Sequence, residues 1–449
     1  MESLREEILR VTLKIVELIA KRNSLAREIA RLKSPPTIRR YDVELKVLKA
    51  AITRARELGV EPSLIKRVVG LLIESSAREQ GEDLGRPEVL AEIFLRAKEL
   101  EKSGKSVVHL EVGEPDYSPP KDILEFVYRI KGKLGYGHPL GLEELREHIA
   151  DYISRKYGVK LGLENIAITP GGKYAIYATL RSFLSMGDRV MVIYPAYPPY
   201  TQLVRFVGAT IVPVFTSLEN EWIPDEDKLS KAARSCRAII LNSPSNPTGA
   251  VYSFRFIKRV AELAAEQEAY IISDEVYSDL TFTTYHSMVE VGYERCVTIG
   301  SFSKSFGMPG YRLGYIIASD DAISKISQTL SLTLTCPPVL AQLAGLEAIK
   351  RPELVEENRK VLERRVRVAA ETLDEEGLNY SMPKGGLYVF PRIGVDSYPI
   401  CMRALMERGV ALAPGIAFGP YDHFIRISLG TREEDIERGI KTVARMIRG

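Results

Sequence analysis

The sequence predicts two units of different fold class. The N-terminal unit is all-α, and the second is an α/β unit with a mostly parallel sheet. Apolar residues recur at 4-3 spacing from Leu4 to Leu32, as in a long amphipathic helix. From residue 106 onward, short apolar runs alternate with helical patterns, which is typical of a parallel sheet covered on both faces.

Length and composition narrow the class of protein. The chain has 449 residues, enough for two or three domains, and a net charge of +3, which gives no case for nucleic acid or membrane as a partner. The cysteines are scattered without close pairs, so neither a metal site nor a disulfide framework is predicted. Met1 leads into a charged helix, not a signal peptide, and no run reaches transmembrane length; we expect a cytoplasmic protein.

Three helices are expected in the first 80 residues. The first ends at Pro35 and Pro36, because proline lacks the amide donor and clashes with the preceding turn. The second runs over residues 41–58, and the third begins at Pro62, a favoured place for proline in the first turn. Residues 88–102 form a fourth helical pattern after the stretch GEDLGRP (81–87), which is predicted to be a linker.

Polar residues occupy positions on these helices where a core would be apolar. Arg22 interrupts the stripe of the first helix, and a lone arginine there is most often a structural residue whose charge reaches water. The other helices repeat the pattern, however, and the full set is Arg5, Arg22, Lys33, Glu44, Ser76 and Gln80. Because buried cations need anionic partners, this set predicts a pocket for a small polyanion such as a dicarboxylate.

This region resembles the all-helical (AroQ-type) chorismate mutases, which are intertwined dimers. The matching stretches are LREEI (4–8), AKRNSLA (20–26) and ESSAREQ (74–80), with Lys33 and Glu44 between them. The resemblance implies that Arg22, and Arg5 from the partner chain, bind the carboxylates of chorismate, with Ser76 also at the substrate. It further implies that Glu44 holds the hydroxyl, while the ether oxygen is reached by two residues, Lys33 and Gln80.

One stretch departs from the mutase pattern. Residues 39–44 read RRYDVE, where the family usually has a stretch resembling Asp-x-x-Arg-Glu. Val43 therefore stands in the arginine's place and Arg40 in the acid's, so one usual substrate contact is missing. Arg39 or Arg40 is available to supply the charge instead.

A lysine motif organises the second unit. Residues 301–315 read SFSKSFGMPGYRLGY, which places Lys304 among small residues and an arginine eight residues later. Ser301 and Ser303 leave room for a phosphate-bearing cofactor, and Arg312 can clamp a phosphate bidentately. The alternative interpretation of these residues is a surface turn that contains an ordinary lysine. The long pattern resembles the lysine motif of class I and II (fold type I) aminotransferases, which implies that Lys304 carries pyridoxal 5′-phosphate.

Two further stretches match that family. Asp274 opens the motif DEVY (274–277) thirty positions before the lysine; a lone aspartate after a strand is more often a helix cap. The resemblance implies that Asp274 pairs with the pyridine nitrogen of the cofactor, and that Tyr277 reaches its phenolic oxygen. Residues 242–249 read NSPSNPTG, a proline-rich turn by itself, and by resemblance Asn246 donates to the same oxygen.

The remaining matches complete the expected site. The turn TPGGK (169–173) feeds a helix expected over residues 174–184, and a helix N-terminus attracts phosphate. Residues 424–428 read FIRIS, which predicts a half-buried strand with Arg426 on its polar face. The resemblance implies that Gly172 and Lys173 bind the phosphate of the cofactor and that Tyr197 stacks on its ring. It also implies that Tyr136 reaches the cofactor phosphate of the neighbouring subunit. The substrate carboxylate is expected to contact Gly113 and Arg426.

Together these matches imply a fused enzyme: residues 1–82 a mutase-like domain, 83–105 a linker and approach helix, and 106–449 an aminotransferase. Its large domain is expected at about 131–335 and its small domain at 106–130 and 336–449. The expected substrates are chorismate, a 2-oxo acid (prephenate or an aromatic one) and glutamate or aspartate as amino donor, and the expected assembly is a homodimer. One alternative is an aspartate aminotransferase whose helical domain only dimerises or senses an effector. The other, a DNA-binding regulator, is disfavoured by the near-neutral charge.

Overall fold

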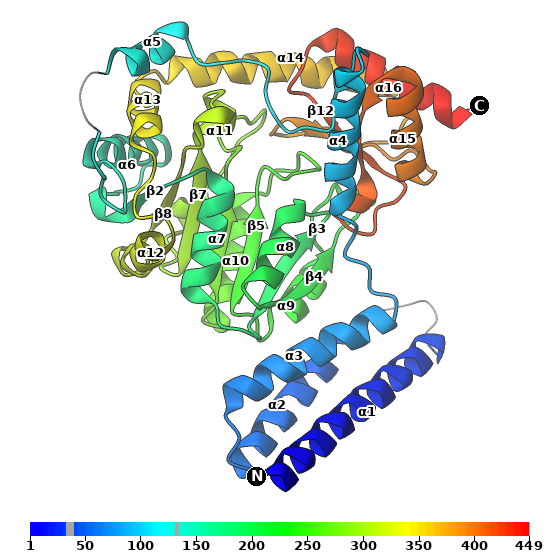
Figure 1. Cartoon of the computed structure of the whole chain (residues 1–449). Helices are drawn as coiled ribbons and strands as arrows, with labels where there is room; N and C mark the ends of the chain where they lie inside the picture. The colour runs from blue at the N-terminus through cyan, green and yellow to red at the C-terminus, as the bar shows by residue number, and fades with distance from the viewer. Residues whose placement is uncertain (33–39, 131–133, 449) are drawn as a thin grey trace.

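The computed structural model describes residues 1–32, 40–130 and 134–448, and Figure 1 shows a helical unit attached to a larger α/β body. The helical unit consists of α1 (Glu2–Leu32), α2 (Tyr41–Glu57) and α3 (Pro62–Glu79), which confirms the three predicted helices. Pro62 lies in the first turn of α3, where its missing amide costs no hydrogen bond. Within the described ranges, no helix has the length and apolar character needed to cross a bilayer.

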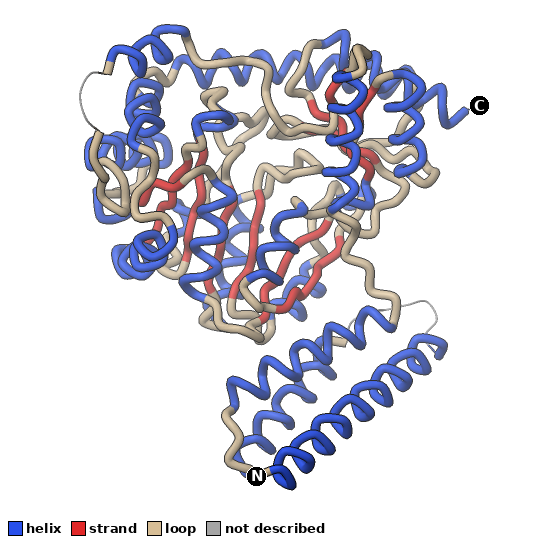
Figure 2. Tube along the Cα trace, viewed as in Figure 1, coloured by secondary structure: helices blue, strands red, loops and turns tan. Residues whose placement is uncertain are grey.

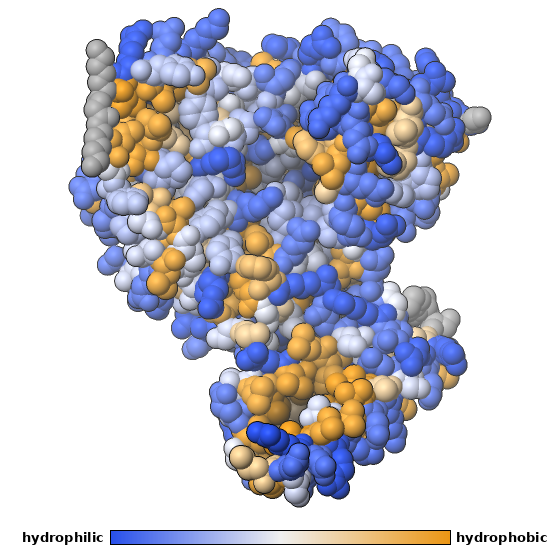
Figure 3. All heavy atoms as spheres, in the orientation of Figure 1, coloured by the Kyte–Doolittle hydropathy of each residue, from blue (hydrophilic) through white to orange (hydrophobic). Residues whose placement is uncertain are grey.

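The apolar stripe of α1 is not covered by its own chain. Ala26 is the buried residue of this helix, whereas Ile8, Leu18 and Leu25 of the stripe are 66%, 56% and 50% exposed. Figure 3 shows apolar side chains gathered on one face of the helical unit. An apolar surface of this extent marks an interaction site in most proteins.

The connection between the units is docked onto the α/β body. The backbone amide of Arg86 donates to the carbonyl of Ile416 at 2.7 Å, and Leu84 is buried in the core. Helix α4 (Glu88–Lys102) follows, as predicted for residues 88–102, and buries Ile93 and Ala97 against the smaller domain. The proposed domain limits themselves stay a prediction.

The strands of the large sheet lie side by side between helices (Figure 2). Their order is β2-β8-β7-β6-β5-β3-β4, and β8 runs antiparallel to both of its neighbours while the others are parallel. The sheet is mostly parallel, as the alternation of short apolar runs and helical patterns predicts. The strands are β2 (Ile166–Thr169), β3 (Arg189–Tyr194), β4 (Thr210–Phe215), β5 (Ala238–Asn242), β6 (Tyr270–Asp274), β7 (Cys296–Ser301) and β8 (Gly314–Ala318).

Helices cover both faces of this sheet. One face packs against α7, α8 and α12, and the other against α9 and α10. Helices α5 and α13 bury Ile123 and Leu346 beside α6 and β2. The helices are α5 (Lys121–Arg129), α6 (Glu143–Tyr157), α7 (Gly172–Phe183), α8 (Pro198–Phe206), α9 (Glu226–Ala233), α10 (Phe254–Glu266), α11 (Phe302–Ser305), α12 (Asp320–Thr333) and α13 (Val339–Ile349).

The smaller domain combines two short sheets with helices from both ends of the chain. Strand β1 pairs in parallel with β10, and β12 lies between β11 and β9 in an antiparallel sheet. Its elements are β1 (Val108–His109), α14 (Glu353–Glu375), β9 (Tyr388–Val389), α15 (Ser397–Arg408), β10 (Val410–Ala411), β11 (Ala413–Pro414), β12 (Ile425–Ser428) and α16 (Glu433–Arg448). Short 3-10 turns complete the fold: η1 (Leu163–Asn165), η2 (Leu218–Asn220), η3 (Met288–Val291), η4 (Pro309–Tyr311) and η5 (Gly415–Phe418).

Candidate functional site

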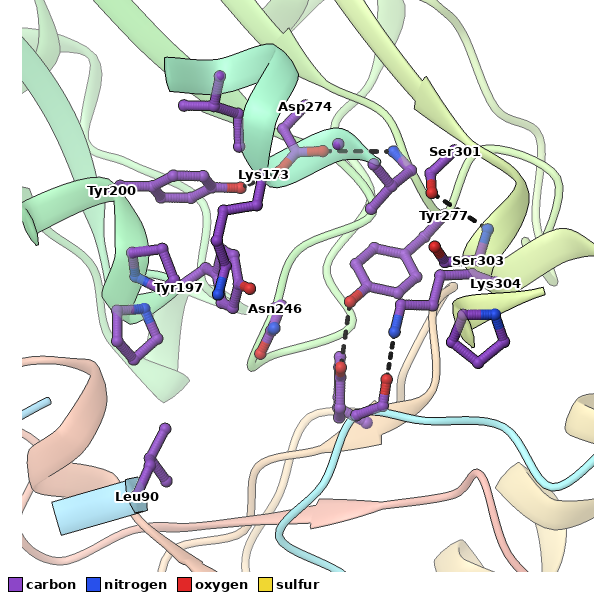
Figure 4. Close-up of a pocket in the computed structure, with 18 of the residues that line it drawn as sticks. Leu90, Lys173, Tyr197, Tyr200, Asn246, Asp274, Tyr277, Ser301, Ser303 and Lys304 are labelled. Carbon is purple, nitrogen blue, oxygen red and sulfur yellow. Dashed lines mark hydrogen bonds between the residues drawn. The ribbon is translucent and has the colours of Figure 1, made fainter. Parts of the chain in front are cut away.

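A cavity of about 490 Å³ lies where the strands of the large sheet end and the smaller domain begins. This is the edge at which ligands bind in open α/β sheets. Figure 4 shows side chains from many parts of the chain pointing into it. The predicted residues that line this cavity are Gly113, Gly172, Lys173, Tyr197, Asn246, Asp274, Tyr277, Ser301, Ser303, Lys304, Arg312 and Arg426.

Lys304 reaches the cavity from α11, the single helical turn that follows β7. Its amine donates a hydrogen bond to the backbone carbonyl of Gly113, and its own carbonyl accepts one from the Tyr117 hydroxyl at 3.0 Å. Burial lowers the pKa of the Lys304 amine, because the charged form is disfavoured away from water. A buried amine of lowered pKa is the form in which lysine acts as a nucleophile or base.

Asp274 ends β6 at another wall of the cavity. Burial raises the pKa of its carboxyl to about 6, and the hydroxyl of Tyr200 lowers that pKa in part by donating to Oδ2 at 2.5 Å. Among the described residues, no cation forms an ion pair with the Asp274 carboxylate. A buried acid in this state can pair with a cationic ring nitrogen.

Groups that can bind a phosphate line a third wall of the cavity. The hydroxyl of Ser301 accepts from the Ser303 amide at 3.1 Å, and the Arg312 guanidinium lies so close to the chain at Gly171 that a Cβ there would come within 2.5 Å of it. Helix α7 begins at Gly172, two residues earlier than predicted, so Gly172 and Lys173 belong to its first turn. Burial and then the nearby Arg312 charge lower the pKa of Lys173. This donor set fits an anion with several oxygens.

Arg426 lies on the side of the smaller domain. The prediction of a half-buried strand is wrong here, because every residue of β12 is buried and Arg426 is 4% exposed. Its guanidinium donates to Asn246 Oδ1 at 3.2 Å and to the carbonyl of Glu111, and it lies 4.4 Å from the centre of the Tyr388 ring. Its Nε is buried and makes no hydrogen bond within the described residues. The guanidinium therefore keeps donor capacity for an acidic ligand.

The sequence analysis missed several lining residues. Tyr200 follows two prolines at the start of α8, and Tyr388 comes two residues after a pair of glycines, so turn composition was the available signal. The hydroxyls of Tyr388 and Tyr277 lie 3.1 Å apart. Leu90 and Ala91 of α4 complete the wall, together with Pro87 just before this helix. Helix α4 therefore borders the cavity directly and is more than an approach helix.

Tyr136 lies outside this cavity. It is 92% exposed and follows the residues 131–133 that fall outside the described ranges. The predicted contact with a neighbouring subunit stays a prediction.

A second cavity of about 410 Å³ lies within the helical unit and brings together residues of all three helices. Four of the predicted residues line it: Arg22, Glu44, Ser76 and Gln80. The guanidinium of Arg22 donates to the carbonyl of Leu72 and to the Ser76 hydroxyl, and burial lowers its pKa. Arg22 is half-buried and points toward α3.

The predicted polyanion pocket has two more members, Arg5 and Lys33. Arg5 is exposed near the start of α1, about 25 Å from Arg22 along the helix axis at 1.5 Å per residue. Lys33 lies outside the described residues, as does Arg39. Arg40 and Val43 do line the cavity, and Arg40 makes a two-point contact with Asp42 at 3.0 and 2.8 Å.

Comparisons with known proteins match the two units of the chain to two families. The family model "Aminotransferase class I and II" matches residues 105–443, and "Chorismate mutase type II" matches residues 4–81. An aspartate/prephenate aminotransferase of Thermus thermophilus is 34% identical over 376 residues, which cover 81% of this chain and 96% of the relative. A (5-formylfuran-3-yl)methyl phosphate transaminase of Methanocaldococcus jannaschii is 36% identical over 360 residues, covering 78% and 94%. The solved aspartate aminotransferase of Thermus thermophilus with maleate has a TM-score of 0.75 at 34% identity, covering 80% of this chain and 97% of that one.

Proposed function

Because this chain belongs to the class I and II aminotransferases and carries a type II chorismate mutase domain before that region, we propose that it is a bifunctional enzyme. Its helical unit converts chorismate to prephenate, and its α/β unit transfers an amino group to a 2-oxo acid. The observation that carries the proposal is that each set of charged residues converges on a cavity of its own. An enzyme that combines these two activities acts in the synthesis of phenylalanine and tyrosine.

The cofactor of the α/β unit is pyridoxal 5′-phosphate, and the cavity fits it. Hydroxyls, a guanidinium and the N-terminus of α7 stand at one wall for the phosphate, the Asp274 carboxyl stands at another for the ring nitrogen, and the Lys304 amine is available to the aldehyde. When bound, this cofactor supplies an electron-poor ring that stabilises negative charge at the α-carbon of the amino acid.

The protein's own groups orient the reactants and move protons. Lys304 would hold the cofactor's aldehyde through Nζ, and the lowered pKa of its amine suits it to take and return the proton at the substrate α-carbon. Asp274 would keep the proton on the ring nitrogen. Tyr197 would stack against the ring, and two donors, Asn246 and Tyr277, would hold its phenolic oxygen.

Substrate binding rests on Arg426. Its planar guanidinium matches a carboxylate, and its buried Nε has no hydrogen-bond partner among the described residues. Gly113 lies at the same end of the cavity, so backbone can approach the carboxylate closely. We take prephenate or an aromatic 2-oxo acid as the acceptor, since the first unit makes prephenate and one relative is named for it, with glutamate or aspartate as donor.

The helical unit needs no cofactor, because its rearrangement is unimolecular. The residues only select the compact conformer of chorismate and stabilise the negative charge that builds on the ether oxygen. Arg22 and Ser76 bind a carboxylate, Glu44 holds the hydroxyl, and two donors, Gln80 and Lys33, serve the ether oxygen. Arg40, which lines the cavity beside Val43, supplies part of the missing charge.

The second carboxylate of chorismate requires a partner subunit. Arg5 is too far from Arg22 on the same helix to serve the same cavity, and the exposed apolar stripe of α1 offers the surface on which a second copy packs. The active form is therefore a homodimer. Tyr136 serves the phosphate of the neighbouring α/β unit in the same way.

A direct assay tests the proposal. The purified full chain is offered chorismate alone, and then glutamate or aspartate with prephenate, phenylpyruvate, 4-hydroxyphenylpyruvate and oxaloacetate in parallel. We expect prephenate to form from chorismate, and an aromatic or prephenate acceptor to be preferred over oxaloacetate. The alternative is an aspartate aminotransferase with a non-catalytic helical module, which Val43 in the cavity wall favours. This alternative predicts that chorismate is not converted and that oxaloacetate is the preferred amino-group acceptor.

A further inference from the structure

Glu44 lies between the two units of the chain. It lines the cavity of the helical unit, and its Oε2 lies 3.5 Å from Nη2 of Arg189, the first residue of β3 in the large sheet. The two side chains are 13% and 6% exposed, so this ion pair is shielded from solvent. A residue of the α/β unit thus touches a residue of the candidate mutase site.

Arg189 is a buried cation with one anionic partner among the described residues, and that partner is Glu44. Its Nε and Nη2 make no hydrogen bond within the described residues. The Cys236 thiol lies beside it, and burial raises the pKa of that thiol to about 12 although the Arg189 charge opposes the shift. The thiol is therefore neutral at ordinary pH, and the carboxylate of Glu44 is the charge that compensates Arg189.

Close packing fixes the distance between these two groups. A Cβ on Gly70 of α3 would come within 3.3 Å of Thr210 on β4, and one on Gly187 would come within 3.0 Å of the backbone of Arg67. Because Gly187 has a φ of +81°, its turn also favours glycine. Backbone in direct contact leaves little room for the units to slide.

Two more ion pairs cross the same interface. Lys66 of α3 pairs with Asp188, and Nε of Arg205 lies 2.9 Å from Oε1 of Glu74. Neither pair lines the mutase cavity. They hold the units together without touching the site.

We propose that Arg189 is a positioning residue of the chorismate mutase site, supplied by the aminotransferase unit. The inference rests on the proposed mutase function and deepens it. The guanidinium holds the Glu44 carboxylate in the orientation that accepts the substrate hydroxyl. Without it, the carboxylate loses its buried counter-charge and turns toward other donors or water. The mutase site is therefore completed by the sheet of the second unit, and the two catalysts are one structural assembly.

The test replaces Arg189 in the full chain and measures both activities on the same molecules. Arg189→Met keeps the length and removes the charge, and we expect KM for chorismate to rise tenfold or more with a smaller change in kcat, since a substrate-binding group is displaced. Arg189→Lys restores the charge and should stay within threefold of the wild type. Transamination should remain within twofold in both variants, which verifies that the α/β unit is folded.

Two further measurements separate positioning from general stability. Arg205→Met removes an ion pair from the same interface but not from the cavity, and should leave chorismate KM within twofold. In a double-mutant cycle, Arg189→Met should have no further effect once Glu44→Gln is present. Multiplicative effects of the two changes, or an Arg189→Met variant with wild-type KM, would overturn the inference. A wild-type chain that does not rearrange chorismate would refute the proposed mutase function itself, and this inference with it.

Discussion

The hydroxyl of Tyr200 donates a 2.5 Å hydrogen bond to Oδ2 of Asp274, joining the start of α8 to the end of β6 (Figure 4). Both side chains are buried, at 2% and 3% exposure. This bond and the one from the Val276 amide at 3.4 Å partly offset the effect of burial on the Asp274 carboxyl. Tyr200 therefore adjusts the charge state of the residue proposed to meet the cofactor ring.

Tyr200→Phe should weaken cofactor binding. Loss of the donor raises the pKa of Asp274 further above about 6, so less carboxylate is present at pH 7 to pair with the ring nitrogen. We expect the Kd for pyridoxal 5′-phosphate, measured by titrating cofactor-free protein, to rise about tenfold, as a lost charged hydrogen bond implies. Tyr293→Phe removes a 2.8 Å bond to the Ala269 carbonyl away from the cavity and is the matched control. Equal affinity in both variants would contradict the role of Tyr200.

Asp274→Asn should stabilise the cofactor-free protein at high pH. The folded-state pKa of about 6 lies above the ordinary 3.8, so the folded state keeps its proton longer than the unfolded state, and wild-type stability falls as pH rises from about 4 to about 6. Asparagine does not titrate, so its advantage grows over that window to on the order of 2–3 kcal/mol at pH 8. Urea unfolding at pH 4.5 and pH 8 measures this difference. Asp227→Asn on exposed α9 is the control, and an advantage of equal size at both pH values would disprove the linkage.

Lys304→Ala should abolish transamination and the visible absorbance of the bound cofactor, because the Nζ proposed to hold the aldehyde is lost. Mutase activity should stay within a few-fold of the wild type, since Lys304 lies in the cavity of the other unit. Both rates are measured on one preparation. The assignment fails if transamination persists, or if a folded variant loses both activities.

Arg22→Ala should abolish the rearrangement of chorismate without unfolding the helical unit. Burial already disfavours the charge of this guanidinium, so its removal costs little stability beyond the two hydrogen bonds to Leu72 and Ser76. Arg27→Ala removes an exposed ion pair with Glu79 on the same helix and should keep the mutase rate. A wild-type rate in Arg22→Ala would make it a structural residue only.

Subunit mixing tests the shared mutase site. Arg5→Ala and Arg22→Ala chains should each be inactive alone, and their coexpression should restore about a quarter of wild-type activity, because half of the dimers are mixed and each has one intact site. Light scattering at micromolar concentration should give twice the mass of the chain. Mixtures without recovery would place Arg5 outside the site. A monomer that keeps both activities would rule out the dimer, and a tetramer would mean that the two interfaces join different pairs of chains.

Local sequence pattern was sufficient for many of the elements and for some of the residues that line the cavities. Proline at position 62 marked the start of α3, since its ring is compatible only with the first turn of a helix. Lys304 and Asp274 follow buried strands, so the parallel arrangement of those strands brought them to one edge, where both line the cavity. Arg22 was recognised because a charged residue is unexpected in the otherwise apolar stripe of a helix.

Contacts between distant segments were decided by the tertiary structure alone. Tyr200 and Asp274 are 74 positions apart, and neither has a local pattern that names the other. The complete burial of Arg426 follows from rings packed around it, and the pairing of Glu44 with Arg189 follows from one unit docking on another. Periodicity reports which face of a single element is apolar, whereas the identity of the covering element depends on the packing of the whole chain. The exposed stripe of α1 is a further example. Its apolar spacing predicts that these side chains are buried, but the described residues of one chain do not cover them.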